Sequence, residues 1–259
     1  MHRELKPTQN YTLMNTLLLI ENTGFWLGWP WMGLGGAVVM IILLFCTDVL
    51  RSNREVSRWR DPLWLAWLAV PMYLIHQFEE YSLHIVDGQY SIVSMFFAPD
   101  GPTAAFGEMN LPLAHFPMMN CVFVWVAIPL GAWLFGKKHP AVALAPFGFI
   151  LANGLLHLMQ SLVGGMPVSE NGGFWSGVLL FIPIAIWVIY VCAKDLKLSA
   201  GAIVISMLSG LLAHVILAGC YFFAIIDIPA GVIVMDILTS FAAIFIALGL
   251  CKLCKIKKF

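Results

Sequence analysis

The chain has 259 residues, of which 61% are hydrophobic and 11% are charged, and its fourteen basic and fourteen acidic residues balance. Soluble domains usually carry about 25% charged residues, so we expect a multi-pass protein of a plasma or inner membrane. Zero net charge and the lack of a basic patch argue against a nucleic-acid partner. The six cysteines lie in or beside apolar runs, which is not the pattern of a disulfide framework.

Residues 1–30 are predicted to form an N-terminal arm. The first ten residues are polar and lack the basic-then-apolar pattern of a cleavable signal peptide. The stretch 11–29 is apolar in part, but Glu21 and Asn22 interrupt it and tryptophans gather at its end. This pattern predicts an interfacial helix with an aromatic belt, with an eighth membrane span as the alternative.

Residues 31–250 are predicted to form a single all-α domain, a polytopic membrane bundle of about seven transmembrane helices. A spanning helix needs roughly 20 mostly apolar residues, and seven runs meet this requirement. They are 31–50, 63–83, 114–135, 141–163, 174–193, 199–222 and 229–250.

The charges of the loops orient these spans. Four arginines lie within 51–60, two lysines lie in each of the third and fifth loops, and four lysines lie in the tail at 251–259, whereas the alternate loops contain no lysine or arginine. The positive-inside rule then places the N-terminus outside and the basic tail in the cytoplasm. The long loop 84–113 falls on the outer face, where it is either a lid or an ordinary connection. The single Cys251–Cys254 pair supplies only two thiolates and predicts no zinc site.

One span carries an unusual concentration of ionisable groups, the sequence His76-Gln-Phe-Glu79-Glu80. Residues three and four apart on a helix share a face, so both carboxylates can lie beside the imidazole. Each ionised group at mid-membrane costs roughly 2.5–3.5 kcal/mol on insertion scales. The stretch therefore requires compensation by a metal, a shared proton or a polar partner.

Other intramembrane polar residues are expected at the same depth. A rise of about 1.5 Å per residue places His76, His157 and His214 about 20–24 Å above the cytoplasmic ends of their spans, in the outer half of a core about 30 Å thick. The remaining polar residues near this level are Asn120, Asn153, Gln160 and Asp236. The shared depth predicts one buried site built from five helices, with His115 outside it at the membrane interface.

The motif His76-Gln-Phe-Glu79-Glu80 resembles the HXXEE family of multi-spanning membrane proteins over roughly residues 63–225. The second histidine of that family corresponds to His157. A Tyr-x-Pro-Gly motif of the family corresponds to Glu170–Gly173, where this chain lacks both the tyrosine and the proline. The function of the family is unassigned, so the resemblance supports the site without implying a reaction.

We predict a divalent metal, zinc in preference to iron, bound by His76, Glu80, His157 and His214. Imidazole suits several transition metals, and with zinc either Glu79 or Glu80 would act as general base. Asn120, Asn153, Gln160 and Asp236 would support these ligands. The expected reaction is hydrolysis of a lipid or other hydrophobic substrate that enters from the membrane.

Several alternatives remain open at this stage. With iron, both glutamates would be ligands and the reaction would be oxidative, while a metal-free Glu–His pair could catalyse an isomerisation. A proton- or metal-coupled transporter would use the same cluster as a relay, and a structural or sensory protein would use it for stability. The oligomeric state does not follow from the sequence.

Overall fold

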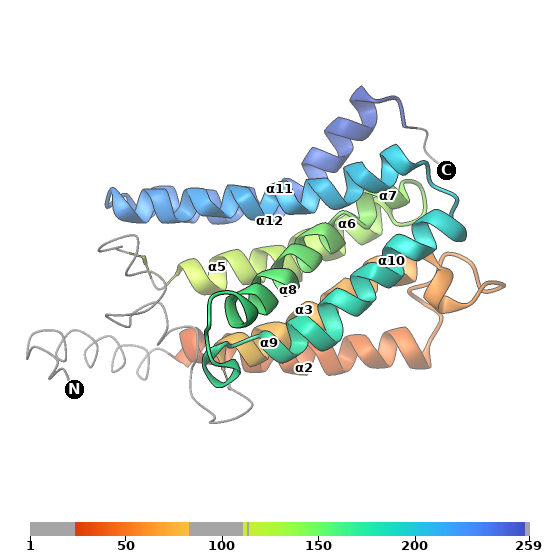
Figure 1. Ribbon diagram of the computed structural model, residues 1–259. Coiled ribbons are helices and arrows are strands. Elements are labelled where there is room, and N and C mark those ends of the chain that lie inside the picture. Colours follow the sequence, from red (N-terminus) through yellow and green to blue (C-terminus); the bar gives the residue numbers. More distant parts are fainter. Residues whose placement is uncertain (1–23, 83–110, 113, 257–259) are drawn as a thin grey trace, which may run out of the picture.

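The computed structural model of the protein describes residues 24–82, 111–112 and 114–256, and within these ranges it contains helices and connecting segments but no strand. Most of the predicted interfacial helix and of the loop 84–113 lies outside the described residues. The described helices form a bundle whose long axis runs across Figure 1. The all-helical membrane fold is therefore confirmed.

The membrane segments match the predicted runs closely. They are α2 (Gly24–Cys46), α3 (Pro62–Tyr81), α5 (His115–Cys121) continued by η3 (Val122–Ala127) and α6 (Ile128–Phe135), α7 (Pro140–Ala143) followed by α8 (Pro146–Leu162), α9 (Phe174–Ser176) continued by η5 (Gly177–Phe181) and α10 (Ile182–Lys194), α11 (Ala200–Ile225) and α12 (Pro229–Leu253). Short 3₁₀ turns, η1 (Arg58–Arg60) and η4 (Val168–Glu170), lie in the connections. Six of these segments are long and apolar enough to cross a membrane. The seventh, α3, has 20 residues, but its polar residues lower its hydropathy.

The first membrane helix begins at Gly24 and ends at Cys46, earlier at both ends than predicted. Pro30 lies inside it, which membrane helices tolerate more readily than soluble ones. Two side chains from the following segment account for its end: the Arg58 guanidinium and the Trp64 indole both donate hydrogen bonds to the carbonyl of Leu44. A cation at a helix C-terminus also compensates the negative end of the helix dipole.

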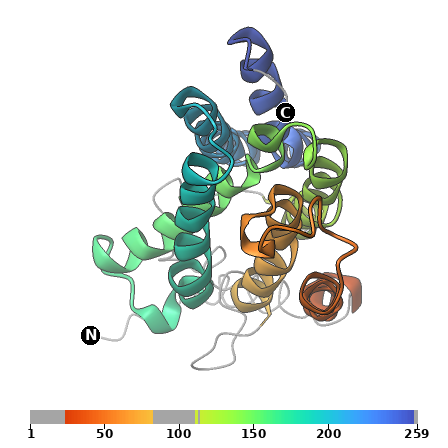
Figure 2. The ribbon, with the colours of Figure 1, turned by 90° about the vertical axis from the view of Figure 1, so that its right-hand side faces the viewer.

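The helix that carries the HXXEE motif, α3, is the most enclosed part of the bundle. Asp61 begins it by accepting hydrogen bonds from the backbone N–H groups of Leu63 and Trp64, with Pro62 in the first turn. Most of its side chains are buried, and Figure 2 shows it between α2 and the other helices. Because its neighbours shield it from lipid, α3 can carry ionisable groups that a lipid-facing helix could not.

Two glycines bring α8 against α11. A Cβ atom at Gly148 would lie 2.1 Å from the carbonyl oxygen of Met207, and one at Gly210 would lie 2.1 Å from the backbone nitrogen of Phe149. Small residues allow this close approach of backbones, which is a common way to associate helices in membranes. The contact fixes α8, and therefore His157, relative to the rest of the bundle.

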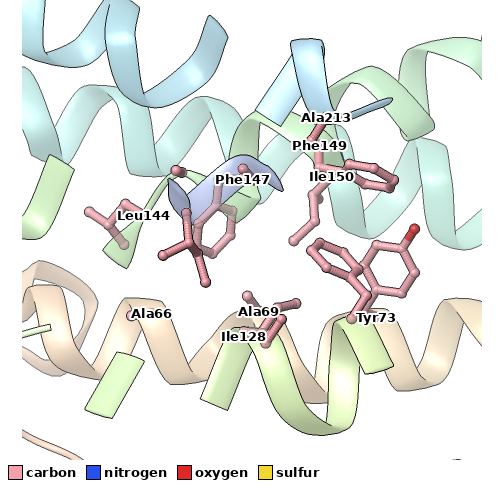
Figure 3. Close-up of a cluster of buried hydrophobic side chains, with 14 of the residues drawn as sticks. Ala66, Ala69, Tyr73, Ile128, Leu144, Phe147, Phe149, Ile150 and Ala213 are labelled. Carbon is pink, nitrogen blue, oxygen red and sulfur yellow. The ribbon is translucent and has the colours of Figure 1, made fainter. Parts of the chain in front are cut away.

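An aromatic cluster lies one turn below the motif. The ring of Tyr73 contacts those of Phe123, Phe149 and Phe181, with centroids 5.1–6.3 Å apart. Figure 3 shows Ala69 and Tyr73 of α3 in one cluster with Ile128 of α6 and Phe149 of α8. We call Tyr73, Phe123, Phe149 and Phe181 the aromatic floor, because the ring of His76 lies 5.6 Å from Tyr73 and 4.4 Å from Phe181.

Candidate metal centre

Three ionisable side chains predicted to form the site come together on top of the aromatic floor. His76 and Glu80 lie one turn apart on α3, and His157 faces them from α8. His76 Nε2 lies 3.4 Å from Glu80 Oε2, and His157 Nε2 lies 3.7 Å from Glu80 Oε1. One ligand atom from each residue falls within 4.8 Å of the others. All three residues are buried, with exposed fractions of 0% for His76, 7% for Glu80 and 4% for His157.

The connection between α8 and α9 orients His157. Its Nδ1 lies 2.9 Å from Asn171 Oδ1, while the amide nitrogen of Asn171 donates to the His157 carbonyl and to Ser161 Oγ. These two donations fix the orientation of the Asn171 amide. Its Oδ1 can only accept, so Nδ1 of His157 carries the proton and the lone pair is on Nε2, which lies 3.7 Å from Glu80 Oε1.

Ser176 orients His76 in the same way. Its hydroxyl donates to the carbonyl of Gly173 and lies 2.8 Å from His76 Nδ1. The Ser176 oxygen is then available to accept the Nδ1 proton, which leaves the lone pair on Nε2. His76 Nε2 is buried and makes no aligned hydrogen bond among the described residues, although the side chains of Glu80 and Asn153 lie close to the imidazole. An unpartnered nitrogen of this kind suits a metal ligand.

Gly173 covers the edges of both imidazoles. Its φ is +86°, a conformation that glycine adopts without penalty. A Cβ atom there would lie 2.6 Å from His76 Cε1 and 3.1 Å from His157 Nε2. The backbone at this position therefore lies directly over the two rings, and only glycine leaves room for them.

Glu79 has surroundings different from those of Glu80. Its two carboxylate oxygens accept hydrogen bonds from the backbone N–H groups of Trp175 and Ser176, at 2.9 and 2.7 Å. These N–H groups belong to the first turn of the helix that begins at Phe174, where a carboxylate also interacts favourably with the helix dipole. Glu79 thus caps a neighbouring helix, whereas Glu80 faces the histidines.

The structure disperses the other predicted site residues. His214 is half-buried on α11 and contacts the ring of Phe149, outside the group formed by His76, Glu80 and His157. Asn120 accepts a hydrogen bond from the side chain of Gln77. Asp236 pairs with His115 in a separate group of side chains.

Two predicted supporting residues stay on α8 beside His157. Asn153 lies one turn before it, is buried, and has no hydrogen-bond partner for Oδ1 among the described residues. Gln160 lies half-buried about one turn after it. The residues predicted to form one layer therefore belong to separate groups, because a shared depth does not determine the direction in which each side chain points from its helix.

The spacing of the three ligand atoms fits a divalent ion. Tetrahedral ligands bound at about 2.0–2.1 Å stand roughly 3.3 Å from one another. His76 Nε2 lies 3.4 Å from Glu80 Oε2 and His157 Nε2 lies 3.7 Å from the other oxygen, Oε1. Each distance is close to that value and long for a charge-assisted hydrogen bond, and one ligand atom from each residue lies within 4.8 Å of the others. Together with the unpartnered nitrogen of His76, this spacing makes the group a candidate metal centre.

One family of known proteins matches part of the chain. Residues 67–188 match the family model described as "Protein of unknown function with HXXEE motif", so the resemblance of this segment to the HXXEE family is confirmed. The match covers α8 and most of α3 and α10, and it ends before α11 and α12. No curated protein and no solved structure matches the chain.

Two residues of the site, Asn171 and Ser176, are not among the site residues predicted from the sequence. Both are common polar residues at the start of a helix, where capping explains them sufficiently. A signal was nevertheless present, because Asn171-Gly-Gly173 occupies the place of a motif in the related family. A segment that departs from the family motif directly after the helix that carries His157 is a good candidate for a positioning role.

Proposed function

We propose that His76, His157 and Glu80 bind a divalent metal, zinc in preference to iron, and that the protein is an integral membrane enzyme that hydrolyses a lipid-like ester or amide. The observation that carries this proposal is the convergence of two imidazole lone pairs on one carboxylate, with His76 Nε2 left without a hydrogen-bond partner. Two histidines and one glutamate form a ligand set that zinc uses in hydrolases.

The charge balance of the centre supports a hydrolytic role. A divalent ion held by two neutral imidazoles and one carboxylate keeps one net positive charge. Glu79 does not neutralise this charge, because its carboxylate is hydrogen-bonded to a helix N-terminus. Burial makes an uncompensated charge costly, so the centre favours an anionic fourth partner. A divalent ion at such a position polarises a carbonyl group and lowers the pKa of water.

The protein groups around the ion divide the remaining tasks. Asn171 and Ser176 hold the two imidazoles in one tautomer, and hydrogen bonds of this kind also raise the basicity of metal-binding histidines. The aromatic floor closes the centre on the side of the bundle interior. The substrate would therefore approach from the end of the bundle that contains the start of α9, and a hydrophobic substrate can reach that end through the membrane.

An oxidative enzyme is the second candidate. Two histidines and one carboxylate also form the facial triad of non-haem iron oxygenases, which is the specific observation in its favour. Unlike the sequence-based version of this hypothesis, it leaves Glu79 out of the ligand set. Iron would then be required for turnover and zinc would inhibit it.

Hydrolysis can be tested on purified protein in lipid nanodiscs with a panel of fluorogenic lipid esters and amides. We expect turnover that is abolished by chelation, restored by zinc, and reduced at least 100-fold in Glu80→Gln. The matched control, His214→Gln, changes a membrane histidine outside the ligand group and should retain activity. Absence of turnover for the whole panel in metal-loaded protein, or equal turnover in Glu80→Gln, would contradict the proposed hydrolase.

A further inference from the structure

A second group of ligand-type side chains lies away from the first, where three other helices meet. His115 begins α5, Cys220 lies near the end of α11, and Asp236 lies in the second turn of α12. His115 Nδ1 is 2.8 Å from Asp236 Oδ1, and the Cys220 thiol donates a hydrogen bond to the same oxygen at 3.1 Å. We call these three residues the His–Cys–Asp cluster.

The cluster is as buried as the first centre. The exposed fractions are 3% for His115 and 0% for both Cys220 and Asp236, so protein encloses all three side chains. A ligand atom from each residue lies within 4.8 Å of the others. Two of the three residues lie beyond the segment that matches the HXXEE family.

One polar atom of the cluster is left without a partner. Asp236 Oδ2 is buried and has no hydrogen-bond partner among the described residues, although Oδ1 receives both contacts. A carboxylate buried among membrane helices is costly unless its oxygens are satisfied. The hydrogen bonds of the cluster therefore leave the Asp236 Oδ2 atom without a donor, and a bound cation would compensate its charge.

We propose that His115, Cys220 and Asp236 form a second metal site, specific for a thiophilic divalent cation of the zinc class. A thiolate, a carboxylate and a neutral imidazole together neutralise a divalent ion, which suits a buried position. Thiolate ligands favour zinc and other soft ions over magnesium or calcium. This site shares no residue with the first centre and does not depend on the function proposed for it.

Metal binding requires only a small rearrangement of the cluster. At bond lengths of about 2.0 Å to nitrogen and oxygen and about 2.3 Å to sulfur, tetrahedral ligands stand roughly 3.3–3.6 Å apart. The present contacts of 2.8 and 3.1 Å would lengthen by about half an ångström. The ion would replace both hydrogen bonds. Cys220 would release its thiol proton to solvent, and the neutral imidazole of His115 would carry its proton on Nε2 so that Nδ1 can bind the ion.

The site would tie three helices together. Cys220 and Asp236 lie on the two helices α11 and α12, which run side by side in Figure 1, and His115 brings in the start of α5. The Ser240 hydroxyl already links α12 to α5, because its oxygen lies 3.1 Å from the carbonyl of Met119 as well as 2.7 Å from the carbonyl of Asp236 in its own helix. A bound ion would strengthen this connection at the same end of the bundle as the first centre.

Cobalt(II) provides the test, because a thiolate bound to cobalt gives a charge-transfer absorption band in the near ultraviolet that imidazole and carboxylate ligands do not give. We expect purified protein titrated with cobalt to develop this band up to an intensity that corresponds to one thiolate-bound ion per chain. The band should persist in His157→Ala, which disables only the first centre, and it should disappear in Cys220→Ser. Cys192→Ser is the matched control, since Cys192 is fully buried on α10 and outside the cluster, and it should retain the band.

Two results would overturn the proposal: absence of the band from the wild-type protein, or an undiminished band in Cys220→Ser. Asp236→Asn and His115→Gln keep the thiol and test the cluster if Cys220→Ser fails to fold. We expect each to weaken cobalt binding at least tenfold. Cobalt affinity equal to that of the wild type in both variants would also contradict the site, whatever happens at the first centre.

Discussion

The backbone N–H of Ser176 donates a hydrogen bond of 2.7 Å to Glu79, so the first glutamate of the motif is bound to a helix N-terminus instead of to a histidine. Its neighbour Glu80 lies between the two imidazoles. The two adjacent carboxylates therefore have separate tasks: one positions the segment that carries Ser176, and the other faces the candidate metal.

This division predicts opposite effects for two conservative substitutions. Glu79→Gln replaces one accepting oxygen by an amide that faces a backbone donor, so we expect a loss of about 1–3 kcal/mol of stability with zinc still bound. Glu80→Gln should lose zinc from the first centre with a smaller effect on stability. Melting temperature and zinc content of the two variants, measured side by side, check the prediction. The reverse pattern would make Glu79 the ligand.

Gly173 should not tolerate a side chain. An alanine there has an unfavourable positive φ, worth about 1–2 kcal/mol, and its Cβ also displaces the rings of His76 and His157. We expect Gly173→Ala to lower both the melting temperature and the zinc content of the first centre. Gly165→Ala is the matched control, because Gly165 has a φ of +71° with open space around it, and it should lower the melting temperature alone. Equal zinc contents in the two variants would contradict the packing of Gly173 against the rings.

Asn171 should tune metal affinity without touching the metal. Removing the hydrogen bond to a ligating histidine typically weakens metal binding by about 10–100-fold, and we expect this for Asn171→Ala. Ser161→Ala removes only one contact of the Asn171 amide and should stay within a few-fold of the wild type. Zinc competition titrations in a Cys220→Ser background measure the first centre alone. An unchanged affinity in Asn171→Ala would show that His157 is oriented by other means.

Much of the fold could be predicted from the sequence, because a helix that crosses a membrane must have a minimum length and few polar residues. The continuous segments Pro140–Leu162, Phe174–Lys194 and Pro229–Leu253 begin and end within a few residues of the predicted runs. The first span was misplaced, because Pro30 and the polar residues before it look like an interruption, whereas α2 continues through Pro30.

Only part of the candidate site could be predicted from the sequence. Rise per residue predicts the depth of a side chain but not the direction in which it points around the helix axis. For this reason His214 and Asp236, which have the right depth, lie outside the centre that contains His76 and His157. Asn171 was missed because its role depends on a contact between a loop and the preceding helix, which has no periodic signal.

The loop charges predict that the C-terminus is cytoplasmic. A fluorescent protein fused after Phe259 should fluoresce in cells, and a periplasmic-type alkaline phosphatase fused at the same place should be inactive, because each folds only on its own side of the membrane. The opposite pair of results would show that the bundle has the reverse orientation in the membrane, with both clusters in the inner half of the bilayer.

The central claim is that His76, His157 and Glu80 form one metal centre, and X-ray absorption spectroscopy of zinc bound to the Cys220→Ser protein tests it most directly. We predict a shell of nitrogen and oxygen atoms at about 2.0–2.1 Å with the multiple scattering of two imidazoles, reduced to one imidazole or lost in His157→Ala. Failure of this protein to retain zinc, or an identical spectrum in His157→Ala, would contradict the claim.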